Sequence, residues 1–370
     1  MNFKRVVIKV GSALVAPDGK GCSGKYLLAI ARFITECHHR GKEVILVSSG
    51  SVAAGRQLIH HGSPNPSIAT KQAMASVGQM QMMANWQRFF DTACSQLLIT
   101  HGDLKDRQRY INIKNTLRIL LENNILPVVN ENDTVATQEL KVGDNDNLAA
   151  LVAMVSDADC LFILSDVDGV FDCDPRSNPE AKLFSEIDTI DDALYDMAGG
   201  TSNHIATGGM KTKIQAAEKA IEHGIETYIL NGSNSGIFEK LLRGENPGTR
   251  FIAKHTAVKA KKHWLKHTLK SHGSIVIDDG AINALLNKGA SLLASGITEI
   301  WGDFAKGESV NITAHCGTRV LAKGISQYSS QDLAKLKGKN SSDFEQILGY
   351  CQSKEIIHRD DLVLMESIES

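Results

Sequence analysis

The sequence predicts an α/β protein: a three-layer sandwich around a mainly parallel sheet, followed by a small β-rich domain. Over the first two-thirds of the chain, short apolar runs alternate with segments of helical periodicity, which is typical of parallel strands joined by helical crossovers. Some runs, such as Leu161–Leu164, are continuous and indicate strands buried on both faces. From about residue 260 the runs become short and are bounded by glycine, asparagine and aspartate, as in a small β domain. We therefore expect domains at residues 1–255 and 262–370.

The individual elements follow from the same two periodicities. The expected strands of the first domain are apolar or β-branched runs: Phe3–Val10, Glu43–Val47, Gln96–Thr100, Ile125–Val129, Cys160–Leu164 and Glu226–Leu230. The expected helices carry apolar residues three and four positions apart: Tyr26–His39, Ile68–Phe90, Gln108–Asn123, Leu148–Val155 and Met210–His223. In the second domain the runs expected to form strands are Ser274–Ile277, Gly289–Ala294, Ile297–Trp301, Ser309–Ile312 and Arg319–Ile325.

Composition excludes several classes of protein. The formal net charge of −2 gives no sign of a polyelectrolyte partner for the chain as a whole. The seven cysteines have no CxxC or metal-ligand spacing, which favours a reducing compartment. The N-terminal segment MNFKRVVIKVGSALV lacks the long apolar run and the cleavage site of a signal peptide, and no stretch approaches the length of a membrane span. We therefore expect a cytoplasmic protein without a membrane segment.

Candidate phosphate-binding residues follow the first two strands. Ligands of open parallel sheets bind outside the carboxyl ends of the strands. At the end of the first strand, Gly11 would let backbone N–H groups approach a phosphate, and Lys9 could direct an ammonium group to the same point. After the second strand, Ser49 and Gly50 precede a helix whose free amides suit an anion, although a serine N-cap alone would also explain them.

Asparagine and aspartate are concentrated after the fourth strand, in Asn130–Asp133 and Lys141–Asn147. Turn and capping chemistry accounts for one or two of these residues, but not for the Asp-Asn-Asp-Asn alternation that follows Gly143. Such a set can bind an ammonium group, orient a lysine or reach a metal through water.

The later strands are also followed by candidate phosphate-binding residues. Ser165 and Asp166 come after the fifth strand, and the glycine-rich segment Thr207–Lys213 opens a helix without being a Walker A loop. Each signal is weak alone, but all fall at one edge of one sheet, and phosphoryl transfer requires little more than cations and N–H donors. Gly19, Gly21 and Gly24 form a GxGxxG string that does not directly follow a strand, so we interpret it as a flexible loop in preference to a dinucleotide site.

Several segments resemble the amino acid kinase family: VIKVGSALV, SSGSVAAGR, NENDTVAT, KVGDNDNLAALVA, DVDGVFDCDPRSNP and ATGGMKTKIQAA. The second domain resembles a PUA domain through Lys288–Leu293 and Gly296–Ile297. The resemblance covers nearly the whole chain and implies the amino acid kinase fold with an appended PUA domain. It also implies that ATP phosphorylates the γ-carboxylate of L-glutamate, as the first step of proline biosynthesis, with Mg²⁺ held mainly by the ATP phosphates.

The resemblance further implies roles for individual residues. Lys9 and Lys213 would neutralise the transferred phosphoryl group, and Asp146 would orient these lysines. Asp133 would bind the substrate ammonium group. The implied substrate-binding residues are Ser49, Gly50, Asp133 and Asn145. The implied ATP-binding residues are Lys9, Gly11, Ser165, Asp166, Thr207, Gly208, Gly209, Met210, Lys211, Thr212 and Lys213. A carboxylate nucleophile is already ionised at neutral pH, so the reaction requires no general base, in agreement with motifs that contain no histidine.

Three alternatives stay open. A sister kinase acting on acetylglutamate, aspartate, carbamate or a nucleoside monophosphate would share the phosphate-binding residues. An RNA-binding protein would use the basic stretch Lys254–His272, but no series of aromatic residues accompanies these lysines, and a solvated linker is the favoured interpretation. A catalytically inactive amino-acid sensor is the third.

The resemblance to the family also implies a homodimer or homotetramer and feedback inhibition by proline.

Overall fold

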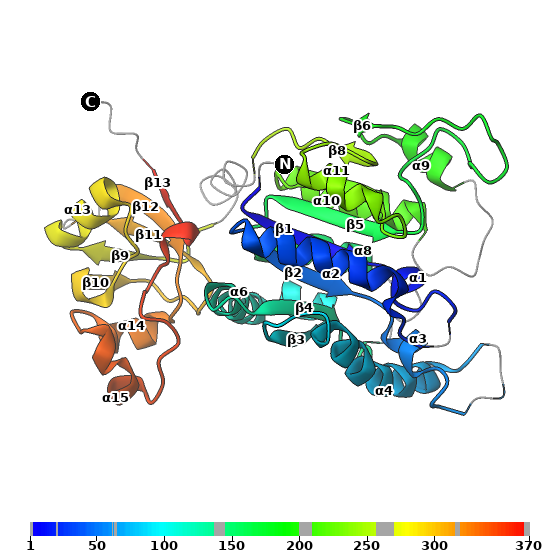
Figure 1. Ribbon diagram of the computed structural model, residues 1–370. Coiled ribbons are helices and arrows are strands. Elements are labelled where there is room, and N and C mark those ends of the chain that lie inside the picture. The colour runs from blue at the N-terminus through cyan, green and yellow to red at the C-terminus, as the bar shows by residue number, and fades with distance from the viewer. Residues whose placement is uncertain are drawn as a thin grey trace. The chain divides into compact units, whose positions relative to one another are not determined.

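The computed structural model describes residues 3–19, 21–60, 62, 65–136, 145–199, 209–256, 270–314 and 319–365, which form two compact units (Figure 1). Unit 1 comprises Met1–Lys105 and Ile113–Ala257, and unit 2 comprises Asp106–Asn112 and Val258–Ser370. Residues 257–269, where the domain boundary is expected, lie outside the described residues. No helix within the described ranges is long and apolar enough to cross a membrane.

Unit 1 is built around an eight-stranded sheet with the order β3-β4-β2-β1-β5-β7-β8-β6. The strands are β1 (Arg5–Val10), β2 (Glu43–Ser48), β3 (Cys94–Ile99), β4 (Leu126–Glu131), β5 (Cys160–Ser165), β6 (Glu186–Ile187), β7 (Glu226–Asn231) and β8 (Thr249–Phe251). The pairings between these strands are parallel apart from the antiparallel β7–β8 pair. The predicted mainly parallel sheet is thus confirmed, and β5 is buried along its whole length, as its continuous apolar sequence predicts.

Helices cover both faces of this sheet. The helices of this part of the chain are α1 (Ser12–Val15), α2 (Gly24–His39), α3 (Ser51–Gly55), α4 (Ile68–Gln87), α5 (His101–Lys105), α6 (Arg107–Glu122), whose first residues belong to unit 2, α8 (Asn145–Val155), α9 (Asp192–Gly199), α10 (Met210–Glu222) and α11 (Gly236–Leu242). On one face, Phe33 of α2, Trp86 of α4 and Phe238 of α11 share a core with the strand residues Ile8 and Phe162. On the other face, α8 contacts β1 and β5, and α10 contacts β7. The three-layer sandwich is therefore confirmed, and α2 is visible across the strands in Figure 1.

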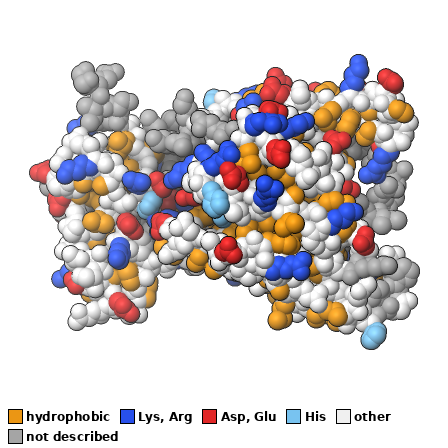
Figure 2. Space-filling model, viewed as in Figure 1, with side chains coloured by type: hydrophobic (Ala, Val, Ile, Leu, Met, Phe, Trp, Pro, Cys, Tyr) orange, Lys and Arg blue, Asp and Glu red, His pale blue; other side chains and the backbone are white. Residues whose placement is uncertain are grey.

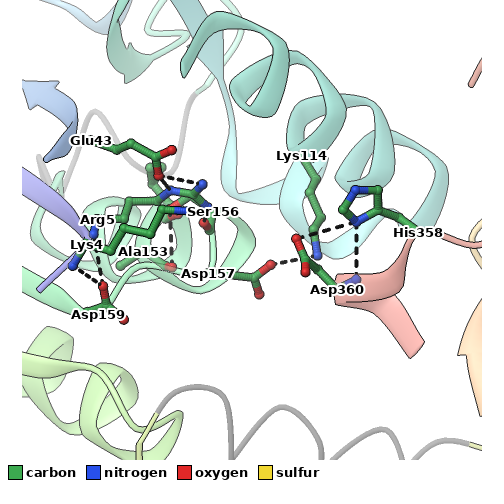
Figure 3. Close-up of polar contacts among 11 residues, drawn as sticks. Lys4, Arg5, Glu43, Lys114, Ala153, Ser156, Asp157, Asp159, His358 and Asp360 are labelled. Carbon is green, nitrogen blue, oxygen red and sulfur yellow. Dashed lines mark hydrogen bonds and ion pairs between the residues drawn. The ribbon is translucent and has the colours of Figure 1, made fainter. Parts of the chain in front are cut away.

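A polar network holds the amino ends of the strands together, at the edge of the sheet opposite to the expected site (Figure 3). The Arg5 guanidinium lies 2.8 Å from the Glu43 carboxylate and also donates to the carbonyl oxygen of Ser156. The Asp159 carboxylate accepts hydrogen bonds from the backbone N–H groups of Lys4 and Arg5 at 2.7 and 2.9 Å. Because these groups satisfy one another between β1, β2 and the end of α8, we interpret this network as structural.

Two glycines set the distance between α3 and α4. A Cβ atom added to Gly78 would lie 1.9 Å from the carbonyl oxygen of Ser51 and 2.4 Å from the backbone nitrogen of Gly55. A Cβ atom added to Gly55 would lie 2.0 Å from the carbonyl oxygen of Met74. The two helices therefore cross with their backbones in contact, and a larger residue at either position would force them apart.

We expect Gly78→Ala to lower the free energy of unfolding by about 1–3 kcal/mol, as is typical of an overpacked core. Urea denaturation measures this loss. Gly102→Ala is the matched control, because its Cβ atom would approach only the Thr100 hydroxyl, at 3.5 Å. Equal stability of the two variants would contradict a tight crossing between α3 and α4.

Unit 2 contains a five-stranded sheet with the order β10-β9-β11-β12-β13. Its strands are β9 (Gly273–Ile277), β10 (Ile297–Trp301), β11 (Ser309–Thr313), β12 (Val320–Ile325) and β13 (Leu362–Leu364). The helices α13 (Asp279–Lys288), α14 (Ser330–Leu336) and α15 (Phe344–Leu348) accompany them. The core includes Ile275, Ile312, Tyr328 and Phe344. The expected small β-rich domain is confirmed.

The expected strand at Gly289–Ala294 is wrong. Gly289 ends α13 in a left-handed conformation with φ of 58°, and Ala294 already belongs to a short 3₁₀ turn. Within this run Leu292 forms an isolated bridge with Ile357. The apolar residues of this run contribute to the core of unit 2 from a helix end and a turn. A short apolar run alone therefore could not tell a strand from a loop.

Charged side chains of both signs are interspersed on the face drawn in Figure 2. Among the described residues of that face, lysine, arginine and acidic side chains alternate without an expanse of one sign, in agreement with the net charge of −2.

Candidate active site

A buried carboxylate lies between two lysines at the carboxyl ends of the strands of unit 1. Lys9 is the penultimate residue of β1, Asp146 lies in the first turn of α8, and Lys213 lies in the first turn of α10. The Lys9 ammonium is 2.6 Å from Asp146 Oδ1, and the Lys213 ammonium is 3.0 Å from Asp146 Oδ2. All three residues are at least nine-tenths buried, with exposed fractions of 6%, 1% and 5%. Residues 204 positions apart in sequence, 9 and 213, are thereby joined through one carboxylate.

The charges of this cluster favour an anion. Burial alone would raise the pKa of the Asp146 carboxyl, but the two neighbouring ammonium groups, of Lys9 and then Lys213, hold it well below its ordinary value. Asp146 is therefore ionised at neutral pH. Two ammonium groups against one carboxylate leave a net positive charge in a buried site, where electrostatic attraction is stronger than in water.

The start of α10 completes the region around the lysine cluster. The Thr212 hydroxyl lies 3.0 Å from Asp146 Oδ2 and 2.8 Å from the carbonyl oxygen of Gly209. Gly209 is the N-cap of α10 and makes no side-chain capping bond, so the first backbone amides of this 13-residue helix are oriented for an anion. Met210 is half-buried and Lys211 is exposed. Thr207 and Gly208 lie outside the described residues.

Gly11 and Ser165 lie at the ends of the two neighbouring strands. The Gly11 N–H donates to the carbonyl oxygen of Leu164 at 3.2 Å, and a Cβ atom on Gly11 would lie 3.6 Å from the Lys9 ammonium nitrogen. Glycine therefore keeps the space beside this ammonium group open. The Ser165 hydroxyl donates to the Asp166 carboxylate at 3.1 Å.

A second group of predicted residues lies around the start of α3. Gly50, the N-cap of α3, has a left-handed conformation with φ of 106°, and a Cβ atom there would lie 2.8 Å from Val15. The Ser49 N–H donates to the carbonyl oxygen of Val10 at 3.0 Å. Asp133 accepts a hydrogen bond of 2.6 Å from the Ser51 hydroxyl. Burial raises the pKa of Asp133 above its ordinary value; the Ser51 hydroxyl lowers it, and the Glu131 carboxylate raises it further.

Asn145 links the two groups, because it directly precedes Asp146 at the start of α8. Its amide nitrogen donates to Asn130 Oδ1 at 2.7 Å and approaches the carbonyl oxygen of Ser48 at 3.4 Å. The Asn130 nitrogen in turn donates to Gln79 Oε1 at 2.9 Å. Asn130 and Asn145 are thus buried and hydrogen-bonded to each other, and do not belong to a solvated turn.

The sequence did not identify four side chains that contact the predicted residues or lie beside them. Ser51 donates a hydrogen bond to Asp133, and Asn130 accepts one from Asn145. Gln79 accepts a hydrogen bond from Asn130, and His101 lies 3.3 Å from the carboxylate of the buried Glu131. Asn130 and Ser51 stand inside segments that were recognised as polar, which was a usable signal. Gln79 lies in α4, where no motif marks it.

Comparison with known proteins decides the family. A model of the amino acid kinase family matches residues 4–231, more than half of the chain. This chain belongs to the amino acid kinase family. A model of the PUA domain matches residues 273–348 of this kinase, within unit 2. The resemblances to the kinase family and to the PUA domain are both confirmed.

Curated relatives match this kinase over almost its whole length. Glutamate 5-kinase from Idiomarina loihiensis is 53% identical over 365 residues, covering 99% of this chain and 98% of that protein. Glutamate 5-kinase from Salinibacter ruber is 49% identical and covers 98% of each chain. Glutamate 5-kinase from Xanthomonas oryzae pv. oryzae is 46% identical and covers 97% of this chain and 100% of its own.

Proposed function

We propose that this kinase transfers the γ-phosphoryl group of ATP to the γ-carboxylate of L-glutamate, giving L-glutamyl 5-phosphate for proline biosynthesis. The observation that carries the proposal is the buried Asp146 carboxylate held between Lys9 and Lys213. The glutamate 5-kinases that match the full chain support glutamate as the acceptor.

The lysine cluster suits transfer between two anions. ATP and a carboxylate repel each other, and the transferred phosphoryl group carries negative charge in the transition state. Lys9 and Lys213 approach from different strand and helix ends, and Asp146 keeps both ammonium groups in place before the substrates arrive. The glutamate carboxylate attacks directly because it is ionised at neutral pH, so the reaction needs no general base.

Glutamate and ATP would occupy opposite sides of the cluster. We assign Asp133 to the substrate ammonium group, Asn145 to the backbone part of the substrate, and Ser49 with Gly50 to the reacting end. On the ATP side we assign Gly11, Ser165 and Asp166 together with the start of α10, Thr207–Lys213. The N-terminal amides of α10 and its positive dipole end are the complement of a phosphate chain.

Mg²⁺ is proposed to enter with ATP. The Asp146 carboxylate does not fit a divalent cation, because two ammonium groups already hold its two oxygens at 2.6 and 3.0 Å. The ATP phosphates are the oxygen ligands that Mg²⁺ prefers. Lys9 and Lys213 would act on the phosphoryl oxygens.

A coupled ADP-release assay with a panel of acceptors tests this function. Glutamate should support turnover, whereas acetylglutamate, aspartate, carbamate and uridine monophosphate should not. Aspartate is one methylene shorter than glutamate, and acetylglutamate lacks the ammonium group that Asp133 is proposed to bind. Turnover with another of these acceptors and none with glutamate would overturn the proposal.

Ser51→Ala should shift the acid side of the pH dependence to higher pH. Asp133 binds an ammonium group only as a carboxylate, so the KM for glutamate should rise as pH falls through its pKa, which is already raised. Removing the Ser51 hydroxyl removes a hydrogen bond that lowers this pKa, and protonation then begins at higher pH. Steady-state KM values from mildly acidic to neutral pH measure the shift. The control, Ser76→Ala on the exposed side of α4, should leave the profile unchanged; a Ser51→Ala profile equal to that of the wild type would contradict the assignment.

We further propose a cytoplasmic homo-oligomer inhibited by proline at the glutamate site. The free cysteines among the described residues suit a reducing compartment. Analytical ultracentrifugation gives the oligomeric state, and a monomer would remove that part of the proposal. Unchanged activity in millimolar proline would remove the inhibition.

A further inference from the structure

A chain of three buried amides leads from α4 to the start of α8. Gln79 Oε1 accepts a hydrogen bond from Asn130 Nδ2 at 2.9 Å, and Asn130 Oδ1 accepts one from Asn145 Nδ2 at 2.7 Å. The exposed fractions of the three side chains are 6%, 2% and 7%, so water does not compete for these bonds. Gln79 therefore acts on Asn145 through Asn130, from a helix that carries none of the predicted site residues.

The direction of the bonds determines what Asn145 presents. A side-chain amide has one acceptor end and one donor end. The carbonyl oxygen of Ser48 can only accept, so Asn145 turns its nitrogen toward it. Asn130 then turns its oxygen toward Asn145 and its nitrogen toward Gln79, whose oxygen accepts it. The Asn145 nitrogen is thus occupied as a donor to Asn130 and to the carbonyl oxygen of Ser48. The Asn145 oxygen makes no hydrogen bond within the described residues and stays available as an acceptor.

The burial of the Gln79 side chain is energetically unfavourable in one respect. Its Nε2 group is buried and has no hydrogen-bond partner. A buried donor without a partner destabilises the fold, and such groups are rare in native proteins. A methionine of similar length would avoid this cost. What the glutamine supplies in return is the oxygen that orients Asn130.

We propose that Gln79 is a positioning residue that holds the Asn130–Asn145 pair in this polarity, so that Asn145 offers an oxygen to the substrate ammonium group. The inference rests on the proposed function and deepens it. An ammonium group has three N–H donors, so Asp133 and Asn145 can bind it together. In the opposite polarity Asn145 would point its NH₂ group at the ammonium, and two donors would face each other.

The test uses Gln79→Met, which removes the oriented oxygen while keeping the length of the side chain. We expect the KM for glutamate to rise by about 10-fold, the effect of one lost hydrogen bond to a charged group, with kcat nearly unchanged. The inhibition constant of glutarate, which is glutamate without its amino group, should stay the same. Gln79→Glu keeps an acceptor oxygen for Asn130 and should retain a KM close to that of the wild type. Should Gln79→Met fail to fold, Gln79→Ala carries the same comparison.

Asn85→Leu is the matched control. Asn85 is also buried on α4, with a side-chain nitrogen that has no hydrogen-bond partner. Its replacement should leave the KM for glutamate unchanged. Equal weakening of glutamate and glutarate by Gln79→Met would indicate a general distortion and overturn the proposal, as would an unchanged KM. Wild-type enzyme without glutamate-dependent turnover would instead overturn the proposed function.

Discussion

Lys213→Ala is expected to lower kcat by about 10²–10³-fold while changing the KM for glutamate little. Removing one donor directed at charge that develops in the transition state typically has this effect. Lys213 fits such a donor, because Asp146 holds its ammonium group in a buried site at 3.0 Å before any substrate binds. Asp133, which we propose binds glutamate, keeps its hydrogen bond to Ser51 in the variant. Initial-rate kinetics with both substrates varied separates the two parameters.

The control for this variant is Lys240→Ala, an exposed lysine on α11. It should leave both parameters at the wild-type values. A Lys213→Ala enzyme with a raised KM and unchanged kcat would contradict a role in the transition state and assign Lys213 to ground-state binding.

Asp146→Asn is expected to lower the free energy of unfolding by about 3–5 kcal/mol at neutral pH. The substitution keeps the size of the side chain but removes the carboxylate that compensates two buried ammonium groups. Activity should fall as well, because the same carboxylate orients both lysines. Chemical denaturation of the wild type and the variant measures the difference in stability.

The difference in free energy of unfolding between the wild type and Asp146→Asn should depend on pH in a defined direction. The pKa of Asp146 is lowered in the folded protein, so its stabilising contribution is present above the ordinary pKa of 3.8 and is lost as pH falls below it. This difference, the stability gap, should therefore be constant near neutral pH and should become smaller in acid. Asp91→Asn, at an exposed position, should show no such gap. A gap that widens in acid would contradict the ion cluster.

The strands and the lysine cluster could be predicted from the sequence for one physical reason. Parallel strands buried on both faces appear as continuous apolar runs, and a polar residue that interrupts or ends such a run must lie at the sheet edge. Lys9 at the end of β1 and Asp146 at the start of α8 were visible in this way. Their direct contact was implied only by the resemblance to the kinase family, because the approach of two distant segments depends on packing.

The roles of Gln79 and Gly78 in α4 could not be predicted, because the sequence of this helix has no distinctive pattern. Residues 72–87 contain no charged side chain, and apolar residues occur around the whole helix, so no face is distinguished by sequence. Gln79 and Gly78 appear ordinary in this context. Their roles depend on Asn130 and Ser51, which approach from other elements.

None of the helices α13, α14 and α15 of unit 2 was predicted, but α13 had signals in the sequence that the search for periodic runs did not use. Asp278 caps its first turn by accepting a hydrogen bond from the Ala281 N–H, and Gly289 ends it in the left-handed conformation. An aspartate and a glycine that bracket about ten residues of mixed polarity indicate a helix as well as they indicate two turns. In this protein Asp278 and Gly289 are the two caps of a helix.

The most direct test of the proposed reaction is to trap its product. An acyl phosphate reacts with hydroxylamine to give a hydroxamate and inorganic phosphate, so wild-type enzyme with ATP, Mg²⁺, glutamate and hydroxylamine should form γ-glutamyl hydroxamate. We predict one hydroxamate for each ADP released, and the loss of both products together in Lys213→Ala. Release of ADP without hydroxamate, or hydroxamate formation at the wild-type rate in Lys213→Ala, would contradict carboxylate phosphorylation at the Lys9–Asp146–Lys213 cluster.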